Sequence, residues 1–275
     1  MATGTIQRAY LAPGLPHLVS NKTVESWEAL RRALRQVGER VKALRPDVLV
    51  IYSTQWISVL GHSFQTNPNL KGLHVDENWY EMGDFPFDLR VDAALGTRAA
   101  EIAASLGLAT KTVNYKGFPL DTGTLVALRF LDPDSTIPVA VVSCNIYAGQ
   151  EDSLKLGRAM RQAIEESGKR AVAVACTALS ARFFTEEIDP RTDRISRTED
   201  DVWNRRILDV IAQGKNAEAL TLSAEYARAA VADMGFKAFA WLMGVLNTPA
   251  IPGNVLAYGP IWGTGAAVVE YTLTG

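Results

Sequence analysis

Three histidines are the side chains best suited to acid–base or metal chemistry near neutral pH, and the sequence spaces them widely. They are His17, His62 and His74, and no two stand four residues apart, as a metal motif on one helix requires. A Walker sequence, a G-x-S-x-G elbow and a G-x-G-x-x-G run after a strand are all missing. Each histidine is therefore expected to be an ordinary surface or hydrogen-bonded residue.

Three other segments carry a more specific signal. They are PGLPHL (13–18) after an N-terminal strand, STQW (53–56) at the end of a buried strand, and GFKAFAWLMGVL (235–246) on a late helix. In order, spacing and flanking residues they resemble the class III extradiol ring-cleaving dioxygenases, a family that includes the catalytic subunit of protocatechuate 4,5-dioxygenase. The resemblance spans nearly the whole chain. It implies a non-haem Fe(II) site with two histidines, one glutamate and open positions for dioxygen and a catecholic substrate.

The residues at the implied iron-binding positions have changed in this chain. Gly14 and Gln55 stand where the resemblance implies the two histidines, and Lys237, four residues before Trp241, stands where it implies the glutamate. An ammonium group only donates hydrogen bonds and repels a divalent cation, an amide oxygen is a weak ligand, and glycine offers no side chain. The sequence therefore predicts that this chain holds neither a metal nor another cofactor.

The acid–base residues that the resemblance implies are replaced as well. Thr122, after Asp121, and Ala181, after Ser180, stand where the family has histidines. A proton shuttle needs a group that titrates near neutrality, and neither side chain does so. We therefore expect no catalytic residue in this chain.

The resemblance extends to members of the family in which a chain with altered ligand positions is a non-catalytic alpha subunit. Such a chain pairs with an iron-bearing beta subunit of the same fold, which binds and opens an aminophenol ring, in a cytoplasmic α2β2 heterotetramer. This implies that the chain stabilises and shapes a partner that holds Fe(II) and the aromatic substrate. Because Trp, Tyr and Phe are enriched at interface cores, the aromatic segments 61–90 and 251–263 are predicted to contact the partner.

An independent metalloenzyme is the first alternative. It would need a relocated metal site, with the long segment 61–90 folded toward the old cleft. The residues available for such a site are His17, His62, His74, Asp76, Glu77 and Asp84.

A binding module for phenolic or anionic ligands is the second alternative. In this case Lys237 and Gln55 would hold the ligand in the vestigial cleft. A lysine in such a cleft is costly unless it is paired. We therefore expect Lys237 to have a carboxylate partner, with Asp121 as a candidate, or several carbonyl partners, or an approach to solvent.

The composition is that of a soluble globular protein. Of 275 residues, 48% are hydrophobic and 21% charged, and the net charge of −2 argues against nucleic acid or an anionic membrane as the default partner. The N-terminus does not read as a signal peptide, and no apolar stretch is long enough to span a membrane. Cys144 and Cys176 lie in apolar runs and are expected to be free buried thiols, which fits a reducing cytoplasm.

Helices and strands alternate along the chain, as in a layered α/β protein. The segment 23–45 has one apolar helical face, with Thr23 as a plausible N-cap, and DVLVIYST (47–54) reads as a strand buried on both faces. Further helices are predicted near 91–106, 151–167, 200–212, 215–233 and 235–246, strands at 137–144 and 170–177, a glycine-rich segment with strand character at 253–273, and long irregular loops at 61–90 and 181–201.

No composition change marks a boundary between these elements. We therefore predict a single domain over residues 1–275, with a central, largely buried β-sheet flanked by helices, like that of the class III extradiol dioxygenases. The GPIWGTG segment at 259–265 is predicted to be a turn-rich loop, because a phosphate site would require a helix to follow it.

Overall fold

A large mixed β-sheet forms the centre of the computed structural model, which describes residues 3–75, 83–116, 118, 120–248 and 250–273. In order across the sheet, its strands are β6 (Thr110–Val113), β3 (His62–Gln65), β7 (Val139–Asn145), β2 (Val48–Ser58), β8 (Arg170–Cys176), β1 (Thr5–Ala12), β10 (Thr264–Thr272) and β9 (Gly253–Ile261). The four strands β7, β2, β8 and β1 run parallel, whereas the flanking β3 and β10 run antiparallel to them. The middle strands are buried on both faces, as their unbroken apolar runs predicted.

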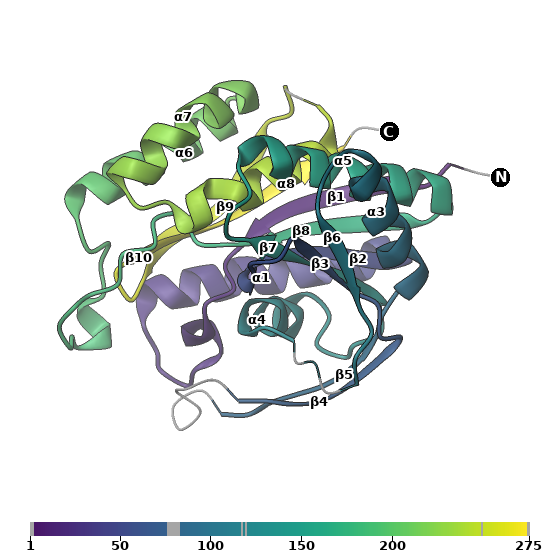
Figure 1. The fold of residues 1–275 in the computed structure, drawn as a ribbon. Coiled ribbons are helices and arrows are strands. Elements are labelled where there is room, and N and C mark those ends of the chain that lie inside the picture. Colours follow the sequence, from purple (N-terminus) through teal and green to yellow (C-terminus); the bar gives the residue numbers. More distant parts are fainter. Residues whose placement is uncertain (1–2, 76–82, 117, 119, 249, 274–275) are drawn as a thin grey trace.

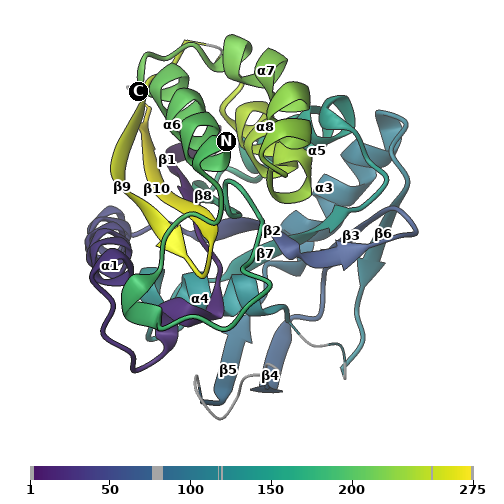
Figure 2. The same ribbon diagram turned by 90° about the vertical axis from the view of Figure 1, so that its left-hand side faces the viewer.

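Helices cover both faces of this sheet (Figures 1 and 2). One face is covered by α1 (Glu25–Leu44) and α4 (Thr122–Leu131), and the other by α3 (Ala93–Ser105), α5 (Gln150–Ser167), α6 (Thr198–Ala212), α7 (Asn216–Ala229) and α8 (Lys237–Leu246). Each face has its own hydrophobic core, with Trp27 in the first and Trp241 in the second. The chain is thus a three-layer α/β domain, which confirms the predicted fold class.

Helices α5 and α8 pack unusually closely because a glycine lies on each side of their contact. A Cβ atom added at Gly157 would lie 2.1 Å from the carbonyl oxygen of Trp241, and one added at Gly244 would lie 2.3 Å from that of Leu154. Side chains cannot occupy such positions. The two glycines therefore let α5 hold the late helix that begins at Lys237.

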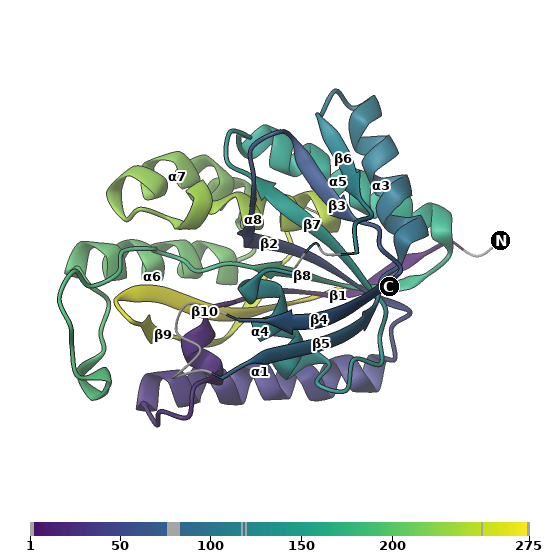
Figure 3. The same cartoon turned by 60° about the horizontal axis from the view of Figure 1, so that its bottom comes forward.

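The segment 61–90 was predicted as an irregular loop, and this prediction is wrong for most of it. It contains β3 and a hairpin of β4 (Asn69–His74) and β5 (Phe85–Arg90), which form a separate two-stranded sheet. Figure 3 shows this hairpin beside α4. The hairpin buries Leu70, Phe85 and Leu89 in the core to which α4 also contributes. This packing stabilises the two strands, which the polar composition of the segment did not indicate. The aromatic residues Trp79 and Tyr80 lie outside the described residues.

Other boundaries differ from the prediction in detail. The N-cap of α1 is Val24, without a side-chain cap, so Thr23 does not have the predicted role. Helix α4 was not predicted; its residues are buried nearly all round, so no broad polar face marks it in the sequence. The segment GPIWGTG was predicted to be a turn-rich loop, but only its two central residues form a turn, and the others belong to β9 and β10. In this turn Trp262 and Gly263 have φ of 51° and 87°, the left-handed pair typical of a two-residue hairpin turn.

Two further expectations can be compared with the structure. Cys144 and Cys176 are free and buried, as predicted, in β7 and β8. Within the described part of the chain, no helix is both long and apolar enough to cross a membrane.

Candidate functional site

The end of strand β2 leaves the sheet and contributes to the wall of a cleft. Ser53 pairs with Ser143 of β7, but the next pair joins Ile57 to Cys144, so residues 54–56 bulge out of the ladder. Bulges of this kind commonly re-aim side chains beside active sites. Here the bulge directs Thr54 and Gln55, from the STQW segment, to the cleft lining.

The cleft has a volume of about 730 Å³, within the usual range for small-molecule sites. It lies between the loop that follows β1 and the turn that precedes α8. Its lining includes Leu15, Pro16, His17, Trp27, Thr54, Gln55, Ala178, Ala181, Phe183, Asp233, Met234 and Trp262. Two of the three segments that carried the family resemblance, 13–18 and 53–56, therefore meet here.

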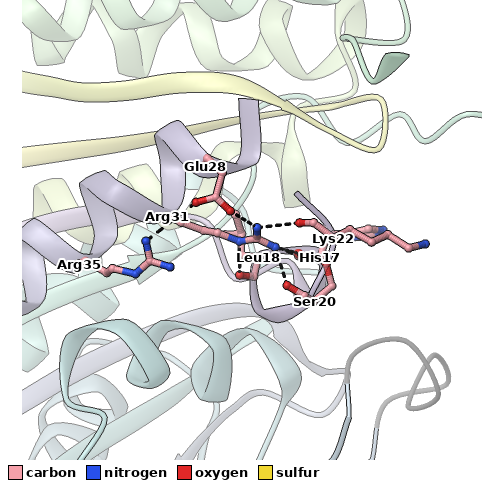
Figure 4. Close-up of polar contacts among 7 residues, drawn as sticks. All are labelled: His17, Leu18, Ser20, Lys22, Glu28, Arg31 and Arg35. Atoms are coloured by element: carbon pink, nitrogen blue, oxygen red, sulfur yellow. Dashed lines mark hydrogen bonds and ion pairs between the residues drawn. The ribbon is translucent and has the colours of Figure 1, made fainter. Parts of the chain in front are cut away.

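A buried arginine holds one wall of this cleft (Figure 4). The guanidinium of Arg31, on α1, donates to the carbonyl oxygens of Leu18 at 2.7 Å, Ser20 at 2.8 Å and Lys22 at 2.8 Å. It also donates to the carbonyl of His17 and pairs with Glu28. The planar fork of Arg31 thus organises the 17–22 turn, which begins within a short 3₁₀ helix, Pro16–Val19.

The aromatic side of the same wall is fixed by Asp193. Its carboxylate accepts hydrogen bonds from Trp27 Nε1 at 2.7 Å and from the backbone nitrogens of Trp262 at 2.7 Å and Gly263 at 3.0 Å. The ring of His17 contacts both indoles: it stacks on Trp262 with centroids 5.7 Å apart and meets Trp27 edge-on at 5.4 Å. Sequence analysis missed this cluster, because Asp193 and the turn at Trp262 lie far along the chain from His17 and Trp27.

Two of the predicted ligand positions, Gly14 and Gln55, lie together. Gln55 Nε2 donates to the carbonyl oxygen of Gly14 at 3.0 Å. A Cβ atom added at Gly14 would lie 2.6 Å from the Cα of Gly123, so any larger residue at position 14 would displace the start of α4. The space beside the first position is thus filled by backbone.

The third position, Lys237, is engaged elsewhere. Its ammonium donates to the carbonyl oxygens of Asn145 at 2.9 Å and Ile146 at 2.8 Å, at the end of β7, and the side chain is partly exposed. The expected carbonyl partners are therefore present. The prediction that Asp121 is the partner of Lys237 is wrong. The carboxylate of Asp121 caps α4 and accepts hydrogen bonds from Ser53 and Thr124.

The residues at these three positions do not fit Fe(II) as they stand. Of the three side-chain positions, only Gln55 offers a metal ligand, a weak amide oxygen, because an ammonium has no free lone pair and glycine has no side chain, whereas a facial triad needs two imidazoles and a carboxylate. Lys237 is also not part of the cleft lining, unlike Gln55. The expectation that Lys237 and Gln55 hold a ligand jointly in the cleft is therefore not met.

The two predicted acid–base positions lie in different surroundings. Ala181 lines the cleft, and its backbone nitrogen donates to the carbonyl of Val231 at 2.9 Å. Thr122 begins α4, and its hydroxyl oxygen lies 2.8 Å from Nε2 of His74, on β4. The hydroxyl of Thr122 therefore serves the contact between α4 and β4.

The relocated metal site is not assembled within the described part of the chain. His17 contacts the two indoles, His62 is buried at the start of β3, where burial lowers its pKa, and His74 lies on β4. Among the described residues, no group of three or more His, Cys, Asp or Glu side chains could hold a metal ion. Asp76 and Glu77 lie outside those residues, and Asp84 is described but joins no such group.

Asp233 is a cleft residue that sequence analysis missed. Its Oδ2 accepts from Thr54 Oγ1 at 2.7 Å, Thr177 Oγ1 at 2.9 Å and the nitrogen of Ala178 at 3.0 Å. Burial raises the pKa of this carboxyl, and the three donors oppose that rise. No local pattern marks the residue, because its three donors come from the ends of two other strands.

The turn that presents Asp233 is strained. The three residues after it, Met234, Gly235 and Phe236, have φ of 45°, 67° and 62°, and this left-handed conformation is comfortable only for glycine. Such strain persists only where surrounding contacts impose it, and it is common at binding sites. Here Phe236 is buried in the core, so packing holds the turn in place.

Comparison with known proteins places these features in context. The family model described as the catalytic LigB subunit of aromatic ring-opening dioxygenase matches residues 11–269. The 2-aminophenol 1,6-dioxygenase alpha subunit of a Pseudomonas species is 40% identical, with 98% of this chain and all of that protein covered. The beta subunit of the same name is 33% identical over 99% of this chain and 96% of its own length.

More distant similarities agree with these matches. The 3,4-dihydroxyphenylacetate 2,3-dioxygenase of Escherichia coli is 22% identical over 82% of this chain and 83% of its own length. A crystal structure of an uncharacterised protein from Escherichia coli K12 has the same fold, with a TM-score of 0.65 at 15% identity, covering 96% of this chain and 99% of that one.

Proposed function

The chain belongs to the LigB family of aromatic ring-opening dioxygenases, and from this premise we propose that it is a non-catalytic alpha-type subunit. In this role it stabilises and shapes a homologous beta-type subunit, which holds Fe(II) and cleaves the ring. The substrate proposed for the pair is 2-aminophenol, because the relatives at 40% and 33% identity are the alpha and beta subunits of a 2-aminophenol 1,6-dioxygenase.

The observation that carries this proposal is the packing at the three ligand positions. Gln55 bonds to the backbone of Gly14, the α4 backbone fills the space beside Gly14, and Lys237 is satisfied by two carbonyls. Each replacement has a structural role of its own. The site therefore supports a chain that has kept its fold without the iron chemistry, with Thr122 and Ala181 as former acid–base positions.

An exposed apolar patch supports a partner subunit. We define it as Ile57, Val59, Leu60, Ile146 and Tyr147, of which Leu60 is 71% and Tyr147 79% exposed. The two parts of the patch are neighbours, because the nitrogen of Ile146 donates to the carbonyl of Ser58 at 2.9 Å. Clustered exposed apolar side chains are typical of protein contact surfaces. The predicted contacts through 61–90 and 251–263 stay predictions.

Further parts of the proposal follow from the relatives and from the cysteines. We place the pair in an α2β2 heterotetramer, because the two relatives carry subunit names and this chain resembles both. We place it in the cytoplasm, because two free buried thiols suit a reducing compartment.

Co-expression tests the proposed function. Three samples are compared: this chain produced alone, a beta-type LigB-family chain with two histidines and a glutamate at the ligand positions produced alone, and the two produced together. We expect co-purification, no ring cleavage by this chain alone, and greater activity or thermal stability of the partner in the complex than by itself. Cleavage of 2-aminophenol by this chain alone, or a partner that is equally stable and active without it, would overturn the proposal.

A further inference from the structure

A second cavity lies outside the cleft, between the second half of α1 and the loop that follows α4. Both helices cover the same face of the sheet (Figures 1 and 3). The cavity has a volume of about 720 Å³ and, among the described residues, shares none of its lining with the cleft. Four cationic side chains line it, namely Arg35, Lys42, Arg45 and Arg129.

These four cations are not neutralised by the surrounding protein. Within the part of the chain that the structure describes, three of them have no carboxylate oxygen within 4.0 Å, and Arg35 only reaches Glu28 at 4.0 Å. By contrast, Arg170 and Arg205, which are similarly exposed, each have a carboxylate oxygen 2.9 Å away. The cavity therefore presents cationic groups that a ligand can bind.

Three carboxylates share this lining but do not balance its charge. Asp132 is buried, and its oxygens accept hydrogen bonds from Thr136 and Ile137 of the same loop. Glu39 and Asp134 are exposed and have no described cation within 4.0 Å. The cations remain in excess even with all three carboxylates charged. A complementary ligand is therefore an anion.

The placement of the cations favours a ligand with more than one anionic group. Arg129 lies in the last turn of α4, whereas the other three cations belong to α1 and its C-cap. A ligand with two or more anionic groups can contact cations from both helices. Buried Pro46 and Leu131 also line the cavity, and apolar surface beside a charge strengthens its interaction with an anion.

The backbone at Arg45 is a further observation. It is left-handed, with φ of 47° and ψ of 58°, at the C-cap of α1. Glycine is the usual residue where a helix ends in this conformation, because a Cβ atom raises the backbone energy. The chain has an arginine there, and its side chain lines the cavity. Arginine binds carboxylate and phosphate groups through two parallel hydrogen bonds.

We infer that this cavity binds a small polyanion, a molecule with two or more carboxylate or phosphate groups, through Arg35, Lys42, Arg45 and Arg129. The inference goes beyond the proposed subunit role, because the cavity lies outside the cleft and its ligand takes no part in iron chemistry.

Isothermal titration calorimetry of the full chain tests the site, at an ionic strength of about 20 mM, where charges are little screened. The probes are inorganic pyrophosphate and citrate, with acetate at the same ionic strength as the monoanionic control. We expect at least one polyanion to bind saturably and about tenfold or more tightly than acetate. Binding of pyrophosphate alone would assign the site to phosphate groups, and binding of citrate alone to carboxylates. No saturable binding of either probe, or affinities equal to that of acetate, would overturn the inference.

Charge-neutralising variants test where the anion binds. Arg45→Gln and Arg129→Gln should each weaken polyanion binding about threefold to fivefold, the scale of an exposed ion pair. Glu39→Gln should instead tighten binding, because it removes a negative charge from the lining. The control is Arg158→Gln, which removes an exposed arginine of α5 on the other face of the sheet and should leave the affinity unchanged.

Thermal unfolding without ligand shows whether each variant is folded. Opposite changes in affinity for the arginine and glutamate variants cannot arise from a general loss of structure. If the two arginine variants lose no more affinity than Arg158→Gln, the anion binds elsewhere and the assignment is wrong. Failure of this test leaves the partner experiment above unaffected, because that experiment measures the two-chain complex.

Discussion

Two neighbouring regions of the cleft, the 17–22 turn and the corner formed by Gly14 and Gln55, are held in place by opposite means. In the wall at 17–22, one buried cation satisfies several backbone carbonyls through Arg31. In the corner, the backbone of Gly14 packs directly against that of Gly123, because neither residue has a side chain. The side-chain amide of Gln55 donates to the carbonyl oxygen of Gly14. The wall keeps a shaped cavity open, whereas the corner leaves no room for a side chain at position 14.

This difference shows that the shape and the chemistry of such a cleft can be separated. The elements that shape it, namely the β2 bulge, the 17–22 wall and the Asp193 cluster, make no use of a metal. The ligand corner can therefore change while the scaffold remains. Variants in each region can test this separation.

The largest loss of stability is expected from Arg31→Met, which removes the side chain that holds the 17–22 turn. Removing a buried guanidinium leaves several carbonyls of the 17–22 turn without donors and takes from Glu28 the nearer of two arginine partners, so the free energy of unfolding should fall by about 3–5 kcal/mol. Urea denaturation measures this loss. Arg35→Met is the matched control on the same helix: its side chain is 60% exposed, and its loss should stay within about 0.5 kcal/mol. Equal losses in the two variants would remove the special role of Arg31.

A smaller effect is expected from Gly14→His in the corner. The new Cβ would overlap the backbone of Gly123, so the free energy of unfolding should fall by about 1–3 kcal/mol through overpacking. Gln55→His loses one hydrogen bond at a partly exposed position and should cost only about 1 kcal/mol. If Gly14→His were the milder change in urea denaturation, the corner would be less tightly packed than described.

Lys237→Met should have a modest effect. It removes the donor to the carbonyls of Asn145 and Ile146 at a partly exposed site, with an expected loss of about 1 kcal/mol. Lys42→Met, on the exposed side of α1, serves as the control and should lie within about 0.5 kcal/mol of wild type. Identical thermal unfolding of both variants would show that Lys237 is only a surface residue.

The smallest effect concerns the pH dependence contributed by Asp233. Because burial raises its pKa in the folded chain, the native state binds more protons than the unfolded state between the two pKa values. Stability from this group is thus fully present below the ordinary aspartate pKa, near 4, and is lost as pH rises through the raised folded pKa. Relative to Asp233→Asn, wild type should lose stability over that interval in urea titrations. A gain with rising pH would reverse the sign of the shift.

The repetitive features of the fold could be predicted from the sequence, because periodicity and apolar runs report directly on burial. The helix at α1 and the strands β2, β7 and β8 were predicted in this way. Helix α4 and the β4–β5 hairpin were missed, because their order depends on packing against each other. The bulge at 54–56 was missed because a register shift is a property of two strands together.

In the candidate site too, features that follow from residue type could be predicted, whereas those that depend on contacts between distant segments could not. Gly14, Gln55 and Lys237 could be singled out from the sequence, because what each residue can and cannot bind follows from its type. The need of Lys237 for partners was also predictable from its charge, but the choice of carbonyls over Asp121 was not, since it depends on where β7 ends. Asp233 and the Asp193 cluster rest on contacts between distant segments, which no local pattern reveals.

The most direct measurement for the central claim is elemental analysis of iron in the chain purified anaerobically with Fe(II), alone and in complex with its co-expressed partner. The account predicts iron in the complex and none above background in the isolated chain. Iron bound stoichiometrically to the isolated chain would contradict the assignment of Gly14, Gln55 and Lys237 as former ligand positions. The three histidines His17, His62 and His74 would then be the first residues to mutate.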